Sequence, residues 1–156
     1  MLQITVSGMS QVTRNLGSIA KGFKNFRPVF EKIGDDFRKT QSAVFRSEGG
    51  FEGRSGWVPL SPQYRLQKAK LYGGKPILQA TGALRNSFTR KGGNHICQIS
   101  NDRIILGSRD PKGGYHQNGT SKMPARPPLE ASNTTNRRWV RIAHKEIMSN
   151  IKKGLI

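Results

Sequence analysis

The sequence predicts an α+β domain in which an antiparallel sheet, made of a meander and an N-terminal strand, is covered by long N-terminal helices and a C-terminal helix. Two helical stripes of apolar residues, one near each end of the chain, enclose a central stretch of short strand-like segments. The 156 residues are a usual length for one domain. We therefore expect residues 1–156 to form a single domain with long loops at about 48–60 and 107–133.

The N-terminal part of the chain predicts a strand followed by helices. Apolar and polar side chains alternate before a glycine, as in a half-buried strand, and the apolar ones are Leu2, Ile4 and Val6. From Val12 to Val44, apolar residues recur mostly at steps of three and four, the spacing of one helix face. Arg27-Pro28 interrupts this stripe, because proline disfavours helical backbone in the residue before it. We expect two helices, roughly 10–25 and 28–46, or one kinked helix.

Glycines limit what this helical unit can form and where it ends. The stripe could also be the seam of a coiled coil, but three glycines within it and poor charge pairing favour packing across a sheet. Four more glycines fall within the nine residues 48–56, a density that a helix does not tolerate. The first helical unit therefore ends before this loop.

The middle of the chain predicts two short helical segments and three strands. Ser61-Pro62 opens a basic helix that runs through Leu71, because serine caps helices and proline suits the first helical position. Thr81 can cap a second helical turn from Gly82 to Asn86. An antiparallel meander follows, with tight connections between three strands: Ser87–Thr89, Ile96–Ile99 and Arg103–Leu106.

The C-terminal part of the chain predicts one long loop and one helix. Residues 107–133 are rich in Gly, Pro, Asn and Ser and show no period, so we expect a loop throughout. An amphipathic pattern then runs from about 135 to 153. The predicted apolar face of this helix consists of Val140, Ala143, Ile147 and Ile151.

The charge balance points to acidic partners. Lys and Arg number 27 against 9 Asp and Glu, a formal net charge of +18, so polyanions or acidic protein faces are attracted to the surface. Arg137, Arg138 and Arg141 flank an indole and are candidate polyanion contacts, with a solvated helix face as the alternative. The charge is spread evenly, +8 in residues 1–78 and +10 in residues 79–156, whereas a dedicated nucleic-acid-binding arm concentrates it.

No pattern in the sequence supports an enzyme. The three histidines are scattered, without a His-Glu-x-x-His pair, and no Gly-x-Ser-x-Gly motif is present. Cys97 lies in a strand pattern, where a buried and inert thiol is usual, and a single cysteine fits a reducing cytoplasm. No segment has the roughly 18 consecutive apolar residues of a membrane span. We therefore expect no catalytic, cofactor-binding or metal-binding residue and no membrane partner.

Three segments carry a resemblance to a known family. Gly56–Ser61 read Gly-Trp-Val-Pro-Leu-Ser, and Ile77–Ser87 contain Thr-Gly-Ala-Leu-Arg-Asn-Ser. Tyr115–Thr120 read Tyr-His-Gln-Asn-Gly-Thr, and Met-Pro-Ala-Arg-Pro follows at 123–127. In order and spacing, over roughly residues 50–132, these segments resemble the phage virion morphogenesis family, the tail completion proteins of Mu-like and related tailed phages.

The resemblance implies a structural protein of the virion neck or tail end, with an α+β fold, that completes tails or makes them competent for joining to DNA-filled heads. We expect it in the virion, and in the host cytoplasm during assembly, as a ring of identical subunits. Its expected partners are neighbouring neck and tail proteins, with DNA in the channel as a further candidate. The rival hypothesis is a basic nucleic-acid-binding protein.

The segments that carry the resemblance also supply the predicted contacts with other subunits or partners: Trp57, Tyr115, His116, Gln117, Arg126 and Pro127. The planar fork of Arg126 suits a carboxylate on an adjacent subunit, and the flanking prolines lower the cost of ordering the segment. Residues 49–56 and 108–128 are too polar and glycine-rich to supply core. We expect these two loops to be mobile in the free subunit and ordered by neighbours after assembly.

Overall fold

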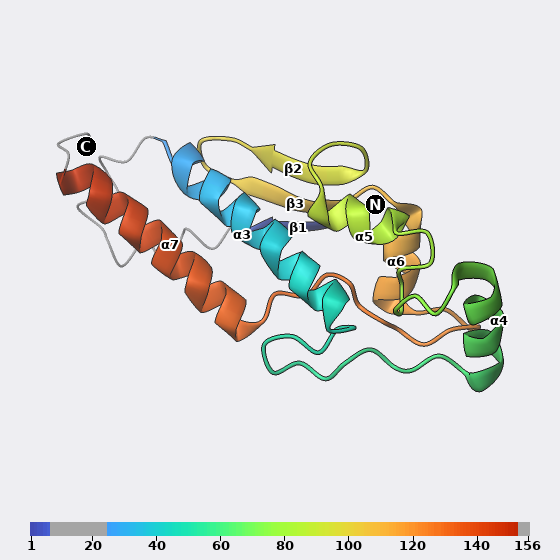
Figure 1. Cartoon of the computed structure of the whole chain (residues 1–156). Helices are drawn as coiled ribbons and strands as arrows, with labels where there is room; N and C mark the ends of the chain where they lie inside the picture. Colours follow the sequence, from blue (N-terminus) through green and yellow to red (C-terminus); the bar gives the residue numbers. More distant parts are fainter. Residues whose placement is uncertain (7–24, 153–156) are drawn as a thin grey trace.

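The computed structural model describes residues 1–6 and 25–152 and confirms the predicted α+β class. Figure 1 shows helices packed against a small sheet, with α4 and the C-terminal end of α7 at opposite ends of the molecule. The predicted helix at 10–25 lies outside the described residues. The strands are β1 (Leu2–Val6), β2 (His95–Ile99) and β3 (Ile104–Ser108), and the helices are α3 (Arg27–Arg46), α4 (Pro62–Tyr72), α5 (Ala83–Thr89), α6 (Pro111–Asn118) and α7 (Asn133–Lys152).

The sheet has the order β1-β3-β2, and both pairings are antiparallel. The N-terminal strand and the two later strands of the predicted meander are confirmed, with small shifts at their ends. The predicted strand Ser87–Thr89 is wrong, because these residues form the last turn of α5. Leu84, Ser87 and Phe88 are buried, and their spacing of three and four places them on one helix face. Burial of this face against the rest of the core explains why the segment is helical.

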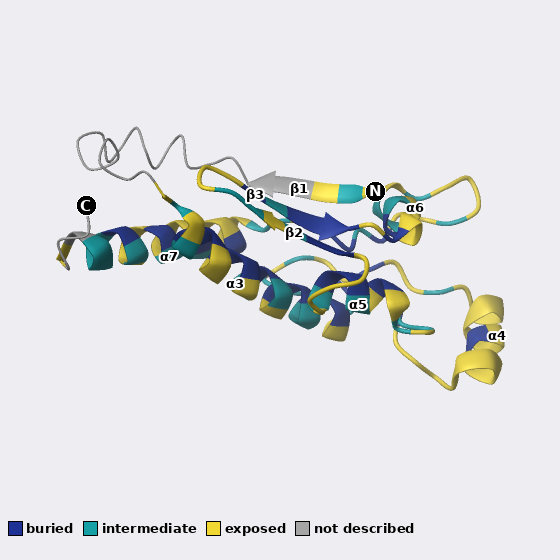
Figure 2. Ribbon diagram, turned by 90° about the horizontal axis from the view of Figure 1, so that it is seen from above, coloured by how far each residue is buried: buried dark blue, intermediate teal, exposed yellow. Residues whose placement is uncertain are grey.

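Helix α3 packs against the sheet and supplies much of the core (Figure 2). Pro28 lies in its first turn, where proline is tolerated, so the predicted helix 28–46 is confirmed. A Cβ atom at Gly34 would lie 3.3 Å from Cys97 Sγ of β2, so glycine permits the close approach of helix and sheet. The buried apolar side chains of α3 are Val29, Phe30, Ile33, Phe37, Val44 and Phe45.

Helix α7 lies beside α3, and its predicted apolar face is confirmed at Ala143 and Ile147 but not at Val140. Val140 is 50% exposed, so its predicted place on the apolar face is wrong, and the side chain of Ile151 lies outside the described part of the chain. The buried residues follow steps of four and are Thr135, Trp139, Ala143 and Ile147. The face turns toward Trp139 because this large ring is buried and its indole N–H donates to Asp36 Oδ2 at 2.8 Å.

The prediction of one loop over 107–133 is wrong at its start. Strand β3 continues to Ser108, and α6 follows from Pro111 to Asn118. The Asp110 carboxylate accepts a hydrogen bond from Lys112 N at 3.0 Å, and Pro111 occupies the first turn, so the Asp-Pro pair begins a helix despite two glycines within it. After α6, the chain has no further helix or strand until α7, apart from an isolated bridge between Thr120 and Met123.

Residues 49–56 and 108–128 contribute to the core, so the expectation that these two loops supply none is wrong. Pro128 is fully buried, and Phe51 packs against the core cluster. Trp57, just beyond the first loop, meets Phe45 edge to face, with their ring centroids 5.4 Å apart. Mobility of the loops in the free subunit stays a prediction, but each has buried anchors within its own chain.

Candidate functional site

Two of the three family-like segments are joined directly by hydrogen bonds. Trp57 Nε1 donates to the Pro127 carbonyl oxygen at 2.9 Å. Arg126 Nε donates to the Val58 carbonyl oxygen at 2.6 Å, and its Nη2 donates to that of Pro59 at 2.9 Å. We call these three bonds the signature clamp. It fixes the 57–59 segment against the 126–127 segment although nearly 70 residues separate them along the chain.

The end of α6 is tied to the same place. Gln117 Nε2 donates to the Leu129 carbonyl oxygen at 2.8 Å, and Gln117 Oε1 accepts from Leu129 N at 3.2 Å. Arg126 N donates to the His116 carbonyl oxygen at 2.8 Å. Gly119 turns the chain between them with φ of 74°, and a Cβ atom there would lie 2.8 Å from Ala125 N. The turn therefore requires glycine for both its backbone angle and its space.

The remaining family-like segment, Ile77–Ser87, is attached to the end of α3. Ile77 N donates to Glu48 Oε1 at 2.6 Å, and Gln79 Nε2 donates to the Phe45 carbonyl oxygen at 2.7 Å. The predicted cap by Thr81 is wrong, because Gly82 is the N-cap of α5 and no side chain caps the helix; Thr81 Oγ1 accepts from Ala83 N at 3.4 Å from the position before the cap. All three segments therefore serve to hold one end of the molecule together.

A groove of about 870 Å³ opens at this end, between α4, the start of α5 and the loop after α6. Its lining is mainly apolar and aromatic and includes Leu60, Tyr64, Tyr72, Leu78, Leu84 and Met123. The cationic side chains of Lys68, Lys112, Lys122 and Arg126 also line it, together with His116. None of the described residues that line the groove is acidic.

One buried lysine holds α4 over the groove. Lys68 is the only buried residue of this helix, and its Nζ donates to the carbonyl oxygens of Lys75 and Pro76, the latter at 2.7 Å. Burial lowers the pKa of Lys68 from its ordinary value. The large apolar side chains of α4, including Leu66 and Leu71, are exposed. The helix therefore buries almost none of its apolar surface within the subunit.

His116, a predicted contact residue, lines this groove. Burial, together with the nearby charges of Arg126 and Lys112, lowers the pKa of His116. Its Nδ1 is buried without a hydrogen-bond partner among the described residues. Tyr115 beside it is 60% exposed, so it is the predicted contact residue that the subunit leaves most open to solvent.

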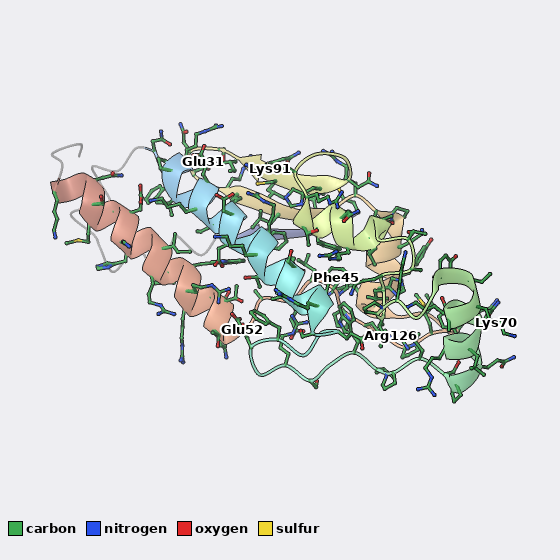
Figure 3. The ribbon with its side chains drawn as sticks, viewed as in Figure 1. Glu31, Phe45, Glu52, Lys70, Lys91 and Arg126 are labelled. Atoms are coloured by element: carbon green, nitrogen blue, oxygen red, sulfur yellow. The ribbon has the colours of Figure 1, made fainter. Side chains whose placement is uncertain are left out.

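A second polar cluster ties the 48–60 loop to α3 and α7. Arg138 Nε lies 2.9 Å from both carboxylate oxygens of Asp36, its Nη1 pairs with Glu52, and its Nη2 donates to Thr40 Oγ1 at 2.7 Å. Figure 3 shows Glu52 beside the first turn of α7. Charge-assisted bonds of this kind are stronger than neutral ones and fix geometry. The cluster therefore anchors a glycine-rich loop that has no helix or strand of its own.

The pKa of the Glu52 carboxyl group in this cluster lies well below its ordinary value. Burial alone would raise its pKa, but hydrogen bonds from Ser132, Thr135 and Arg138, with the positive charge of Arg138, lower the pKa of Glu52 from 4.5 to about 2. The carboxylate is therefore more stable in the folded protein than in water. Its ionised form contributes to the stability of the fold.

We expect the contribution of Glu52 to vanish in acid. Because its folded pKa is lowered, the contribution is complete above pH 4.5 and is lost as the pH falls toward about 2. The free energy of unfolding of wild type should exceed that of Glu52→Gln by about 2–3 kcal/mol near neutral pH, and the difference should shrink below about pH 5. Urea unfolding at constant ionic strength measures both proteins. A difference that does not change with pH contradicts the assignment.

The structure brings five of the six predicted contact residues together: Trp57, His116, Gln117, Arg126 and Pro127. Arg126 is only 6% exposed, and its guanidinium already binds carbonyl oxygens of its own chain. Contacts of these residues with another subunit stay predictions. Within the subunit, they hold the groove in shape.

The three arginines of the predicted polyanion contact do not share one environment. Arg137 and Arg141 are exposed on α7, whereas Arg138 is engaged with Asp36 and Glu52. Neither the groove nor the pairing of Arg138 with carboxylates is predicted from the sequence. The groove had one available signal: Tyr64, Leu71 and Tyr72 of α4 recur at i, i+7 and i+8, the spacing of one apolar helix face, while Leu66 lies off that face.

Within residues 1–6 and 25–152, no group of three or more His, Cys, Asp or Glu side chains is arranged to hold a metal ion. Among the described helices, none combines the length and apolar character that crossing a membrane requires.

Comparison with known proteins identifies the family. The model of the phage virion morphogenesis family matches residues 8–148, which is most of the chain and includes all three segments of the site. No curated protein and no solved structure matches the chain. The family match agrees with the resemblance of the Trp57, Thr81 and Arg126 segments, which the structure shows to be joined at one end of the fold. The chain therefore belongs to the phage virion morphogenesis family.

Proposed function

We propose that this protein is a non-enzymatic assembly protein of the phage neck or tail end, which completes the tail and enables its joining to the head. Membership of a virion morphogenesis family supports a role in assembly. The observation that carries the proposal further is the site itself. Its family-like segments bind one another through Trp57 and Arg126 and leave α4, with exposed Tyr64 and Tyr72, as a surface for other proteins.

We also propose that copies of the protein form a ring. A closed ring requires one patch to meet a different patch on the next copy. Exposed apolar side chains occur on α4 and at Val140 of α7, two elements at different places along the molecule (Figure 1). Because each copy carries a formal charge of +18, like-charge repulsion opposes closure. We therefore expect ring formation to need salt or an acidic neighbour.

Complementation of a phage that lacks this gene tests the proposed function. Without the protein, we expect separate heads and tails, and the wild-type gene should restore joined particles that contain the protein. Electron microscopy counts the particles, and an antibody against an epitope tag locates the protein at the neck or tail end. Normal numbers of joined particles without the gene contradict the proposal.

DNA contact remains a second candidate function, because Arg137 and Arg141 are exposed on α7 beside Val140. We expect Arg137→Ala/Arg141→Ala to bind duplex DNA more weakly and to lower the slope of log affinity against log salt by about 1–2, since each phosphate contact releases counterions. Fluorescence anisotropy across a salt series measures this slope. Loss of particle joining confined to this variant would favour DNA contact as the main function.

A further inference from the structure

We propose that the groove beside α4 binds an acidic segment, with apolar anchor residues, from a neighbouring virion protein. This inference rests on the proposed assembly function for the source of the segment. The groove itself is defined by the contacts of this chain. Three observations indicate its occupant: the apolar side chains of its walls, the cations at its rim, and the engagement of every acidic side chain of this chain with a partner in the same chain.

The walls of the groove favour apolar side chains. Tyr64 and Tyr72 of α4 face a surface that includes Leu78, Leu84 and Met123. Aromatic rings and methionine are enriched where proteins bind one another, because they bury a large area at low entropic cost. A volume of about 870 Å³ accommodates a few side chains of an extended or helical segment and is too small for a folded domain.

The rim of the groove favours carboxylates. Lys112 and Lys122 line it, and neither pairs with a carboxylate among the described residues. Lys68 and Arg126 also line it, but carbonyl oxygens of the chain bind both. The sequence from residue 53 to residue 101, which includes α4 and α5, contains eight Lys or Arg and no Asp or Glu. An acidic segment therefore meets complementary charge on this end of the protein.

A second copy of this chain does not supply that charge. All nine acidic side chains lie in the described residues, and each has a partner within its own chain. Six are in ion pairs, while the others interact with Ile77 N, Ser100 and Lys112 N. Docking of another copy into the groove would instead bring two strongly positive surfaces together.

Nucleic acid also fits the groove less well than an acidic protein segment. Sites for single strands follow the backbone with a series of cations and stack bases on aromatic rings. In this groove, carbonyl oxygens of the chain bind Lys68 and Arg126, so only two cations of the lining, Lys112 and Lys122, are available for a backbone of phosphates. Apolar side chains, those of Leu60, Leu78 and Met123, occupy much of the wall. A protein segment with apolar anchor residues and flanking carboxylates would contact both the apolar wall and the two available lysines.

A fluorescent peptide of ten alternating glutamates and leucines tests the groove directly. We expect it to bind the full-length protein, and the versions with glutamine for glutamate or serine for leucine to bind about tenfold more weakly, because each lacks one of the two contact types. Displacement of the peptide by an oligothymidine of equal charge, at equal concentration, would overturn the choice of a protein segment. Equal binding of all three peptides would overturn the proposal.

Matched variants localise the binding. Tyr72 lines the groove and its neighbour Leu71 does not, so Tyr72→Ala should weaken peptide binding about tenfold and Leu71→Ala should not. Lys122→Glu is matched by Lys145→Glu on α7 in the same way. Thermal unfolding confirms that each variant is folded. If Lys122→Glu and Lys145→Glu lose affinity equally, the binding is a general charge effect. If Tyr72→Ala and Leu71→Ala lose affinity equally, the groove is not the site.

Complementation separates this inference from the proposed function. Groove variants that fail to bind the peptide should also fail to join heads and tails. If they join particles normally, the groove is not the partner site, and the assembly function stands. If deletion of the gene leaves joining normal, the assembly function fails, while the peptide measurements still decide whether the groove selects acidic, apolar segments.

Discussion

Arg138→Ala is expected to lower the free energy of unfolding by about 3 kcal/mol, the lower end of the range for a broken buried ion pair, because the pair is partly exposed. The change leaves Asp36 and Glu52 without their common cation and removes the hydrogen bond to Thr40. The loop around Glu52 should then open. Urea unfolding measures the loss, and hydrogen exchange detects the opening of the loop.

Arg141→Ala is the matched control for Arg138→Ala. It removes the same side chain type from the same helix, but Arg141 is exposed and has no ion pair with a described carboxylate. Its stability should stay within about 0.5 kcal/mol of wild type. Equal losses in the two variants would show that the charge of α7, and not the anchored cluster, stabilises the protein.

Phe37→Ala is expected to cost about 3–5 kcal/mol, the usual range for truncating a buried phenylalanine. Phe37 is 1% exposed, between α3 and the sheet, and its ring stacks on His95 with the centroids 6.2 Å apart. Truncation leaves a cavity that the close packing of α3 cannot fill. Since a small domain is stable by only about 5–15 kcal/mol, the variant should unfold well below the wild-type midpoint in urea.

Leu66→Ala is the control for Phe37→Ala, because Leu66 is 66% exposed on α4. Its effect should stay within about 0.5 kcal/mol. Unchanged stability of Phe37→Ala would mean that this face of α3 is not the core. Equal losses in both variants would instead mean that α4 packs on the protein more tightly than its exposure indicates.

Long amphipathic patterns and capping pairs made most of the fold predictable. The stripe through Phe30 and Phe37 predicts α3, and the Ser61-Pro62 pair predicts the start of α4, where Ser61 Oγ accepts from Tyr64 N. Such signals are local, so neighbours in sequence suffice to interpret them. Asp110-Pro111 is the same kind of signal, and the glycine-rich composition around it concealed α6.

The failures of prediction have a common physical cause. Ser87–Thr89 has strand-like composition, but the position of Phe88 in the assembled core decides that it is helical. The buried face of α7 differs from the predicted one at Val140 because Trp139 donates a hydrogen bond to Asp36, a residue 103 positions away in the sequence. Tertiary packing overrides local preference at such places, and the preference is weak in short segments.

The sequence pointed to Trp57 and Arg126 but not to the groove or to the bonds that these two side chains make within the subunit. The order of the family-like segments indicates that Trp57 and Arg126 matter. Their bonds, however, run to carbonyl oxygens of Pro127, Val58 and Pro59, and a main-chain acceptor has no signature in the sequence. The groove likewise arises only when α4 is placed beside the loop after α6.

Because the acceptors of the signature clamp are main-chain oxygens, the clamp constrains the identity of some residues and not of others. Only the donor side chains, Trp57 and Arg126, are specified by the bonds, because any residue offers a carbonyl oxygen at the acceptor positions. Val58 is such a position, and its side chain is 49% exposed. A substitution of Val58 should therefore change the exposed surface at this point while the hydrogen bonds that shape the groove persist.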